Sequence, residues 1–183
     1  MVSIENRLNE ILAGYQTSFI DKVYSNENND YDLLMQAFGI TPELKRENRQ
    51  YWGRELGKCW ESLIIQASLD HPTFQPALRL GADEPCDLIL DNYAIDAKYR
   101  VGSGDSGTLK KFKQYGPLLR EMGYQPVFLF LRDDNLPAAM QACRQGGWDI
   151  YIGQESFDFI KSLTGFDLKE YLIRKAGAYP VNR

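Results

Sequence analysis

The sequence predicts a mixed α/β domain of the α+β kind, with a central mixed β-sheet flanked by helices and a helical N-terminal extension. Its 183 residues, 44% of them hydrophobic, suffice for one domain with a real core. Apolar residues recur at helical spacing before residue 70 and alternate at strand spacing between residues 77 and 100. A continuous apolar run at 127–131 is typical of a strand covered on both faces. This order of elements excludes an all-helical or all-β fold.

The first part of the chain is expected to be helical. Two helices are predicted within residues 3–38, from apolar residues at helical spacing in 4–12 and then in 19–23, and a polar loop is expected at 25–30. Thr41 before Pro42 is a typical start for a short helix. A long helix follows over about 49–69, with Trp52 and Trp60 expected in the core.

The centre of the chain is predicted to form three meandering strands. These are expected at 77–80, 86–90 and 93–100, separated by turns at 81–85 and 91–92. After a glycine-rich loop, helices and strands alternate: a helix over 108–122, a strand at 127–131, a helix over 136–145, a strand at 148–152 and helical pattern from 156 to 175. We therefore divide a single domain into an N-terminal part (1–48), a core (49–153) and a C-terminal helical part (154–183).

Composition indicates an ordered globular protein of a reducing compartment. Charged residues make up 25% of the chain and aromatic residues 13%. No apolar run approaches the roughly 20 residues that span a bilayer, so no membrane partner and a cytoplasmic location are expected. The three cysteines are widely spaced among apolar residues, which disfavours disulfides and zinc.

Charge is unevenly distributed along the chain. The formal net charge is -4 and the pI about 5.1, which taken alone disfavours a nucleic-acid-binding protein. Residues 95–125, however, have a basic excess, contributed by Lys98, Arg100, Lys110, Lys111, Lys113 and Arg120. A basic segment in an acidic chain is typical of an enzyme that attracts phosphates at one face, and equally of an ordinary solvated helix.

Two neighbouring strands are expected to bring acidic and basic side chains together. Residues two apart on a strand point the same way, so Asp96 and Lys98 share one face of the predicted strand 93–100. A short turn at 91–92 would place Asp87 opposite Asp96. Two adjacent carboxylates suit Mg²⁺, and an amine beside them can stabilise negative charge. The alternative is a surface hairpin with an exposed ion pair.

This constellation resembles the signature of the PD-(D/E)xK nuclease superfamily. Pro85-Cys86-Asp87, eight residues, then Asp96-Ala97-Lys98 is similar to that signature, with one residue inserted between its proline and first aspartate. Gly57-Lys58-Cys59-Trp60-Glu61 on the preceding helix is similar to a Gly-x-x-x-Glu found in many members. The order of elements from 49 to 152 also resembles the family's restriction-endonuclease-like core.

The resemblance implies a site and an activity. Asp87, Asp96 and the carbonyl of Ala97 would hold Mg²⁺, and Lys98 would orient or deprotonate the attacking water. Glu61 would support the metal site, with Glu55 and Glu84 as alternatives. The implied activity is that of a type II restriction endonuclease: a homodimer that hydrolyses double-stranded DNA at a specific short sequence, as part of a restriction-modification system.

Other functions remain open at this point. A Holliday junction resolvase or repair nuclease of the same superfamily would share the site, whereas a non-catalytic DNA-binding module would share only the fold. Residues 102–107 fit G-x-G-x-x-G, a dinucleotide-binding pattern, but the preceding strand is charged on one face. In a nuclease, DNA contacts are expected from the basic segment: Arg100, Lys110, Lys111, Lys113 and Gln114. His71, the one histidine, is expected in a turn.

Overall fold

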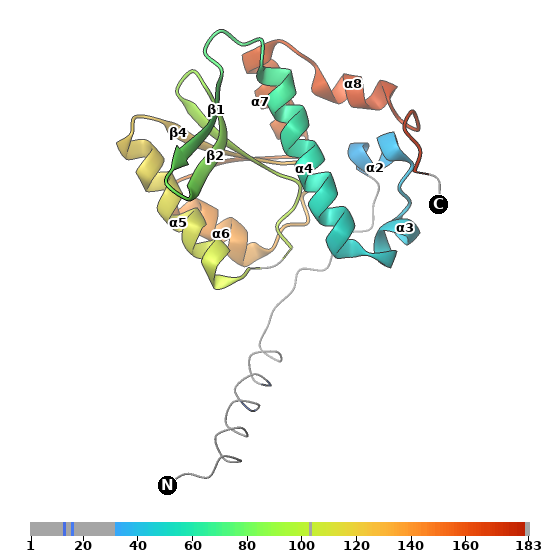
Figure 1. Cartoon of the computed structure of the whole chain (residues 1–183), viewed down its shortest axis with the longest axis horizontal. Helices are drawn as coiled ribbons and strands as arrows, with labels where there is room; N and C mark the ends of the chain where they lie inside the picture. The colour runs from blue at the N-terminus through green and yellow to red at the C-terminus, as the bar shows by residue number, and fades with distance from the viewer. Residues whose placement is uncertain (1–12, 14–15, 17–31, 103, 182–183) are drawn as a thin grey trace.

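The protein folds around a five-stranded mixed sheet that is covered by helices on both faces, as the sequence predicts (Figure 1). The computed structural model describes residues 13, 16, 32–102 and 104–181. The apolar positions that predict the two helices within 3–38, at 4–12 and 19–23, lie outside these residues. Among the helices that are described, none combines the length and apolar character that a bilayer-spanning segment needs.

The strands follow one another across the sheet in chain order. They are β1 (Gln75–Leu80), β2 (Asp83–Leu90), β3 (Tyr93–Lys98), β4 (Gln125–Phe130) and β5 (Asp149–Ile152). The first three form an antiparallel meander, and β3, β4 and β5 are parallel to one another. Parallel neighbours need a crossover, which α5 (Ser106–Glu121) and α6 (Pro137–Gln145) provide.

Each face of the sheet has its own apolar core. On one face, α4 (Arg49–Ser68) and α7 (Gln154–Thr164) pack on residues such as Leu88, Ile95 and Leu129. On the other, α5 and α6 pack on residues such as Ala94, Phe128 and Phe130. Strand β4 contributes to both cores in alternation, as its continuous apolar run predicts.

Short helices from both ends of the chain complete the α4 side. These are α2 (Leu33–Phe38), α3 (Pro42–Glu47) and α8 (Leu168–Arg174). The predicted cap is present, since the Thr41 hydroxyl accepts from the amide of Leu44 at 3.2 Å. Residues 177–181 lie along α2, where the amides of Gly177 and Tyr179 donate to carbonyls of that helix.

Most boundaries differ from the prediction by one or two residues, and two larger differences have a structural cause. Strand β2 begins at Asp83, because the turn before it consists only of Gly81 and Ala82, with Gly81 at φ 65°. The single helical stretch predicted over 156–175 is two helices. Gly165, at φ 73°, ends α7 by donating to the Lys161 carbonyl, and α8 begins three residues later.

Candidate active site

The regular pairing of β2 with β3 ends at the predicted acidic pair, Asp87 and Asp96. Asp91, at φ 51°, and Asn92 form a two-residue turn, and the ladder runs from Leu90–Tyr93 to Leu88–Ile95. Beyond this, the Ala97 amide donates to Asp87 Oδ2 at 2.7 Å. The Asp87 carboxyl therefore replaces a backbone acceptor of the neighbouring strand and is held beside the Asp96–Lys98 segment.

Asp96 and Lys98 share a face of β3, as strand alternation predicts. Lys98 Nζ forms an ion pair with Asp96 Oδ1. Asp96 is buried at 8% exposure, whereas 32% of the Lys98 side chain is accessible. Ile95 and Ala97, which alternate with them along the strand, point into the core beneath α4. The site therefore has a buried acidic side and one basic group that reaches solvent.

Helix α4 brings Glu61 to this site. Position 57 passes over β3, since a Cβ there would lie 3.9 Å from Tyr99 Cβ. The carboxylate of Glu61, one turn later, contributes to the electrostatic potential at both Asp87 and Lys98. Its two rivals have other partners. Glu55 is paired with Arg54 at 2.9 Å and Lys58 at 3.3 Å, and Glu84 lies 3.4 Å from Arg79. Of the three candidates, Glu61 is the one whose charge acts on both Asp87 and Lys98.

The site holds an excess of negative charge. Burial and the neighbouring Asp96 carboxylate raise the pKa of the Asp87 carboxyl to about 8, although Lys98 and the Ala97 amide act in the opposite direction. Burial lowers the pKa of the Lys98 ammonium, but the attraction of Asp96 and Asp87 outweighs this and places the pKa above its ordinary value. Without a further cation, Asp87 therefore holds a proton at neutral pH while Lys98 stays charged.

The residues present fit a divalent cation only in part. The described residues include no cluster of three or more His, Cys, Asp or Glu side chains arranged to hold a metal ion. Asp87 and Asp96 offer carboxylate oxygens, and their mutual repulsion, which together with burial raises the pKa of Asp87, is what a bound cation would relieve. Mg²⁺ keeps several waters and often takes only one or two carboxylates. Its fit here therefore rests on this pair, the Ala97 carbonyl and Glu61.

Asp87→Asn should stabilise the metal-free protein, and more so at alkaline pH. Asp87 carries a proton up to about pH 8 in the folded state but loses it near its ordinary value, 3.8, in the unfolded chain. Its contribution to stability is thus present below pH 3.8 and is lost as pH rises through 8, by up to about 1.4 kcal/mol per pH unit. Asparagine keeps the acceptor for Ala97 without this loss.

Urea unfolding of both proteins in EDTA at pH 6 and pH 9 measures the effect. The advantage of the asparagine variant should grow from pH 6 to pH 9. Asp83→Asn is the matched control, because hydrogen bonds to Tyr115 and Lys111 lower the pKa of that exposed carboxyl. An advantage of Asp87→Asn that is equal at both pH values would contradict a raised pKa.

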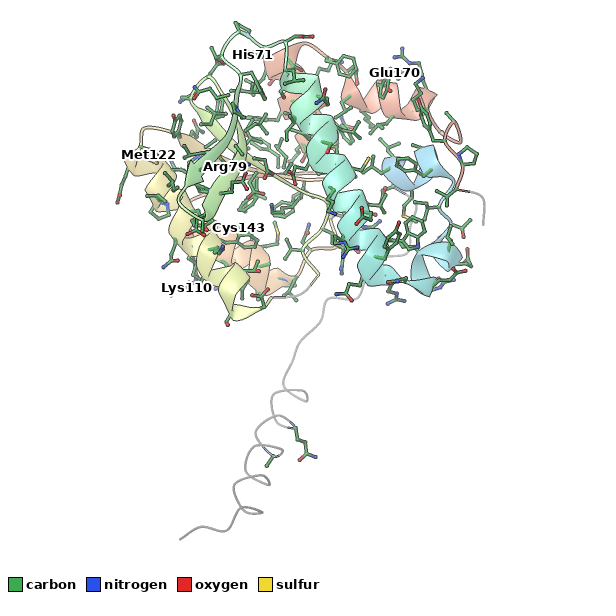
Figure 2. The ribbon with its side chains drawn as sticks, viewed as in Figure 1. His71, Arg79, Lys110, Met122, Cys143 and Glu170 are labelled. Carbon is green, nitrogen blue, oxygen red and sulfur yellow. The ribbon has the colours of Figure 1, made fainter. Side chains whose placement is uncertain are left out.

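The predicted DNA-contacting residues separate into three groups. Lys110, Lys113 and Gln114 are exposed on the outer side of α5, opposite its buried residues, and Lys110 is visible at the surface in Figure 2. Lys111 is exposed but lies 3.1 Å from Asp83. Arg100 is turned inward, with 13% of its side chain exposed and its Nε 3.0 Å from Asp134 Oδ2. Arg100 therefore holds the loop after β4 rather than extending into solvent.

Beside the site lies a buried polar cluster that sequence reasoning missed. We call it the ionic cluster; its members are Asp32, Lys45, Tyr99, Arg132 and Asp134. Arg132 lies 2.9 Å from both Asp32 Oδ2 and Asp134 Oδ1. The Tyr99 hydroxyl donates to Asp32 and accepts from Lys45 Nζ at 3.0 Å. The only sequence signal was the charged pair Arg132 and Asp134 directly after an apolar strand.

The glycine-rich loop does not have the features of a dinucleotide site. The strand that precedes it, β3, has an antiparallel neighbour, β2, whereas a Rossmann sheet is mostly parallel. At the start of α5, Asp105 accepts from the Thr108 amide at 2.8 Å and from its hydroxyl at 2.7 Å. A carboxylate thus occupies the helix start where such a site receives phosphate.

The tryptophans, cysteines and histidine singled out in the sequence can be explained by their structural surroundings. Trp52 and Trp60 are buried, as expected, at 6% and 0% exposure, and Trp148 is buried at 5%. All three cysteines are free thiols, of which Cys86 and Cys143 are buried. His71 lies in the turn after α4, where its ring contacts the Thr73 hydroxyl at 2.9 Å.

Comparison of the chain with protein-family models, with curated proteins and with solved structures finds no match. The geometry of the site therefore carries the functional argument.

Proposed function

We propose that this protein is a Mg²⁺-dependent deoxyribonuclease that hydrolyses phosphodiester bonds of double-stranded DNA, in the manner of a type II restriction endonuclease. The observation that carries the proposal is the meeting of Asp87, Asp96 and Lys98 where the β2–β3 hairpin opens. The fold supports it, since a mixed sheet with helices on both faces agrees with the architecture implied by the resemblance to PD-(D/E)xK nucleases. A cytoplasmic location would give it access to DNA.

The chain's own residues have distinct roles in this proposal. Asp87, Asp96 and the Ala97 carbonyl would hold the cation, with Glu61 supporting them. Bound Mg²⁺ would lower the pKa of a coordinated water and offset charge on the phosphate. Because the pKa of Lys98 lies above its ordinary value, this ammonium is suited to orienting the water and stabilising negative charge rather than accepting a proton. Its partial exposure leaves it accessible to a phosphate.

One further feature agrees with a DNA substrate. Lys110 and Lys113, with Gln114, form an exposed polar strip on α5, which could contact the phosphate backbone. A palindromic site would favour a homodimer, in which each subunit cuts one strand. A junction resolvase or repair nuclease would use the same carboxylates on branched or damaged DNA, and a DNA-binding module would bind without cutting.

A cleavage assay separates these activities. The protein is incubated with a plasmid library and with a four-way junction, first with Mg²⁺ and then with Ca²⁺, a cation that often supports binding without cleavage. We expect discrete plasmid fragments with Mg²⁺ only. Selective cutting of the junction would indicate a resolvase. Binding in both cations without cleavage would favour a DNA-binding module and contradict the proposal.

Lys110→Ala and Lys113→Ala should weaken DNA binding and flatten its salt dependence. Each phosphate contact that is lost lowers the slope of log K against log[salt] by about 0.9. The slope is measured by fluorescence anisotropy in Ca²⁺ over a range of NaCl concentrations. Lys169→Ala on α8 is the matched control, since its ammonium is bonded to Gln154 away from α5. If both α5 variants kept the wild-type salt dependence, the two lysines would lie on a solvated face and would not contact phosphates.

A further inference from the structure

The Tyr99 hydroxyl joins the end of β3 to two helices that lie outside the catalytic core. It accepts from Lys45 Nζ at 3.0 Å and donates to Asp32 Oδ2. Lys45 belongs to α3, and Asp32 is the N-cap of α2, where its Oδ1 accepts from the amides of Leu34 and Met35 at 3.0 Å. Tyr99 thus connects residues 54 and 67 positions away in the sequence.

Arg132 closes the ionic cluster from the loop that follows β4. Its Nη1 donates to Asp32 Oδ2 at 2.9 Å, and its Nε donates to Asp134 Oδ1 at 2.9 Å. Lys45 is 2% exposed, and 5% of the Arg132 side chain is accessible. Buried ion pairs contribute little net stability because desolvation offsets their attraction. A satisfied network nevertheless restricts its members to one geometry, since any displacement leaves a buried charge without its partner.

The ionic cluster acts on the site through the backbone. Tyr99 directly follows Lys98 but points to the opposite face of β3, so its side chain does not contact the ammonium. The Leu131 amide donates to the Lys98 carbonyl at 3.0 Å, and the Arg132 amide donates to the Tyr99 carbonyl at 3.1 Å. These bonds tie the backbone of Lys98 and Tyr99 to the backbone of Leu131 and Arg132. Asp96 and Ala97 belong to the same short strand as Lys98.

We propose that Tyr99, held by Asp32, Lys45 and Arg132, is a positioning residue of the cleavage site, which keeps Asp96, Ala97 and Lys98 in register with Asp87. This inference rests on the proposed nuclease function. Catalytic groups must be held within about 0.5 Å of their productive geometry. Cleavage therefore depends on residues 32 and 45, which precede the core that carries the chemistry.

Tyr99→Phe tests the proposal, because it removes the hydroxyl and keeps the ring over which Lys45 Nζ lies at 5.0 Å. We expect kcat for DNA cleavage to fall about tenfold or more at saturating Mg²⁺, while DNA affinity in Ca²⁺ stays within about twofold. The affinity for Mn²⁺ alone, measured by calorimetry, should fall at least about threefold, because the Asp96 carboxylate and Ala97 carbonyl lose their preorganisation.

Ser68→Ala is the matched control. It also removes one buried hydroxyl, which donates to the Ile64 carbonyl at 2.8 Å within α4. Assays are run below the unfolding transitions of all variants. The control should lower the melting temperature without changing kcat or Mn²⁺ affinity. An equal fall in kcat in the control would reduce Tyr99 to a general structural role, as would wild-type kcat and Mn²⁺ affinity in Tyr99→Phe.

The Mn²⁺ measurement separates this inference from the proposed function. If the wild type cuts no DNA, but Tyr99→Phe binds Mn²⁺ more weakly than the wild type and Ser68→Ala does not, the nuclease function fails and the positioning role stands. If the wild type cuts DNA and Tyr99→Phe behaves like it, only the positioning role fails. Asp32→Asn, which keeps a good N-cap for α2, is a second variant should Tyr99→Phe not fold. It should change kcat and Mn²⁺ affinity in the same direction.

Discussion

We expect Lys98→Met to slow DNA cleavage strongly while leaving fold and DNA binding intact. The substitution removes the one ammonium paired with Asp96 and keeps most of the side-chain volume. Loss of a preorganised charge at a reacting phosphate costs about 10²–10³-fold in kcat. The fold should survive, because a third of the side chain is accessible and the strand's apolar residues are unchanged. Single-turnover cleavage at saturating Mg²⁺ measures the effect.

Lys111→Met is the matched control for this experiment. Lys111 is also an ion-paired lysine, 3.1 Å from Asp83, but it is exposed and lies on α5 rather than at the acidic pair. The control should keep near wild-type kcat. Asp96→Ala should slow cleavage strongly, as Lys98→Met does. If Lys98→Met retained wild-type kcat, the proposed centre would have to be abandoned, whatever the control did.

The second large effect is on stability, at the crossing of α5 and α6. In this crossing, a Cβ on Gly116 would lie 1.8 Å from the Gly146 carbonyl oxygen, and a Cβ on Gly146 would lie 2.1 Å from the Phe112 carbonyl oxygen. Trp148 Nε1 also donates to that Phe112 carbonyl at 2.8 Å. Backbone therefore packs directly on backbone, and no flexible side chain can move aside.

Gly116→Ala should lower the free energy of unfolding by about 3 kcal/mol or more, at or beyond the upper end of ordinary overpacking. Urea unfolding monitored by circular dichroism measures it. Gly53→Ala on α4 is the control, since a Cβ there meets no atom within 4 Å. That variant should gain about 0.5–1 kcal/mol from the better helix former. Equal stability of Gly116→Ala and wild type would mean that the two helices cross less closely.

Gly57, the glycine of the Gly-x-x-x-Glu resemblance, differs from Gly116 in the space available for a Cβ. An added Cβ there would make ordinary van der Waals contact with Tyr99. Space alone does not require glycine at this position. The spacing predicted Glu61, whose charge acts on Asp87 and Lys98, but the motif's glycine has no steric explanation in the structure.

The sequence by itself determined the core of the site. Asp87, Asp96 and Lys98 lie within twelve residues of one another, and the turn at Asp91 and Asn92 sets the register that brings them together. Strand alternation then decides which side chains share a face. Both signals are local and need no knowledge of the remaining chain. For the same reason, the buried character of β4 could be predicted from its apolar run.

Only the tertiary structure decided what surrounds that core. Arg132 and Asp32 pair across 100 positions, and no local pattern indicates such a partner. Arg100 appeared in the sequence as a DNA-contacting residue but is bound to Asp134, because the loop after β4 lies beside the end of β3. Only the packing of α4 against the sheet brings the charge of Glu61 to bear on Asp87 and Lys98. Long-range packing, which periodicity does not encode, places these charges.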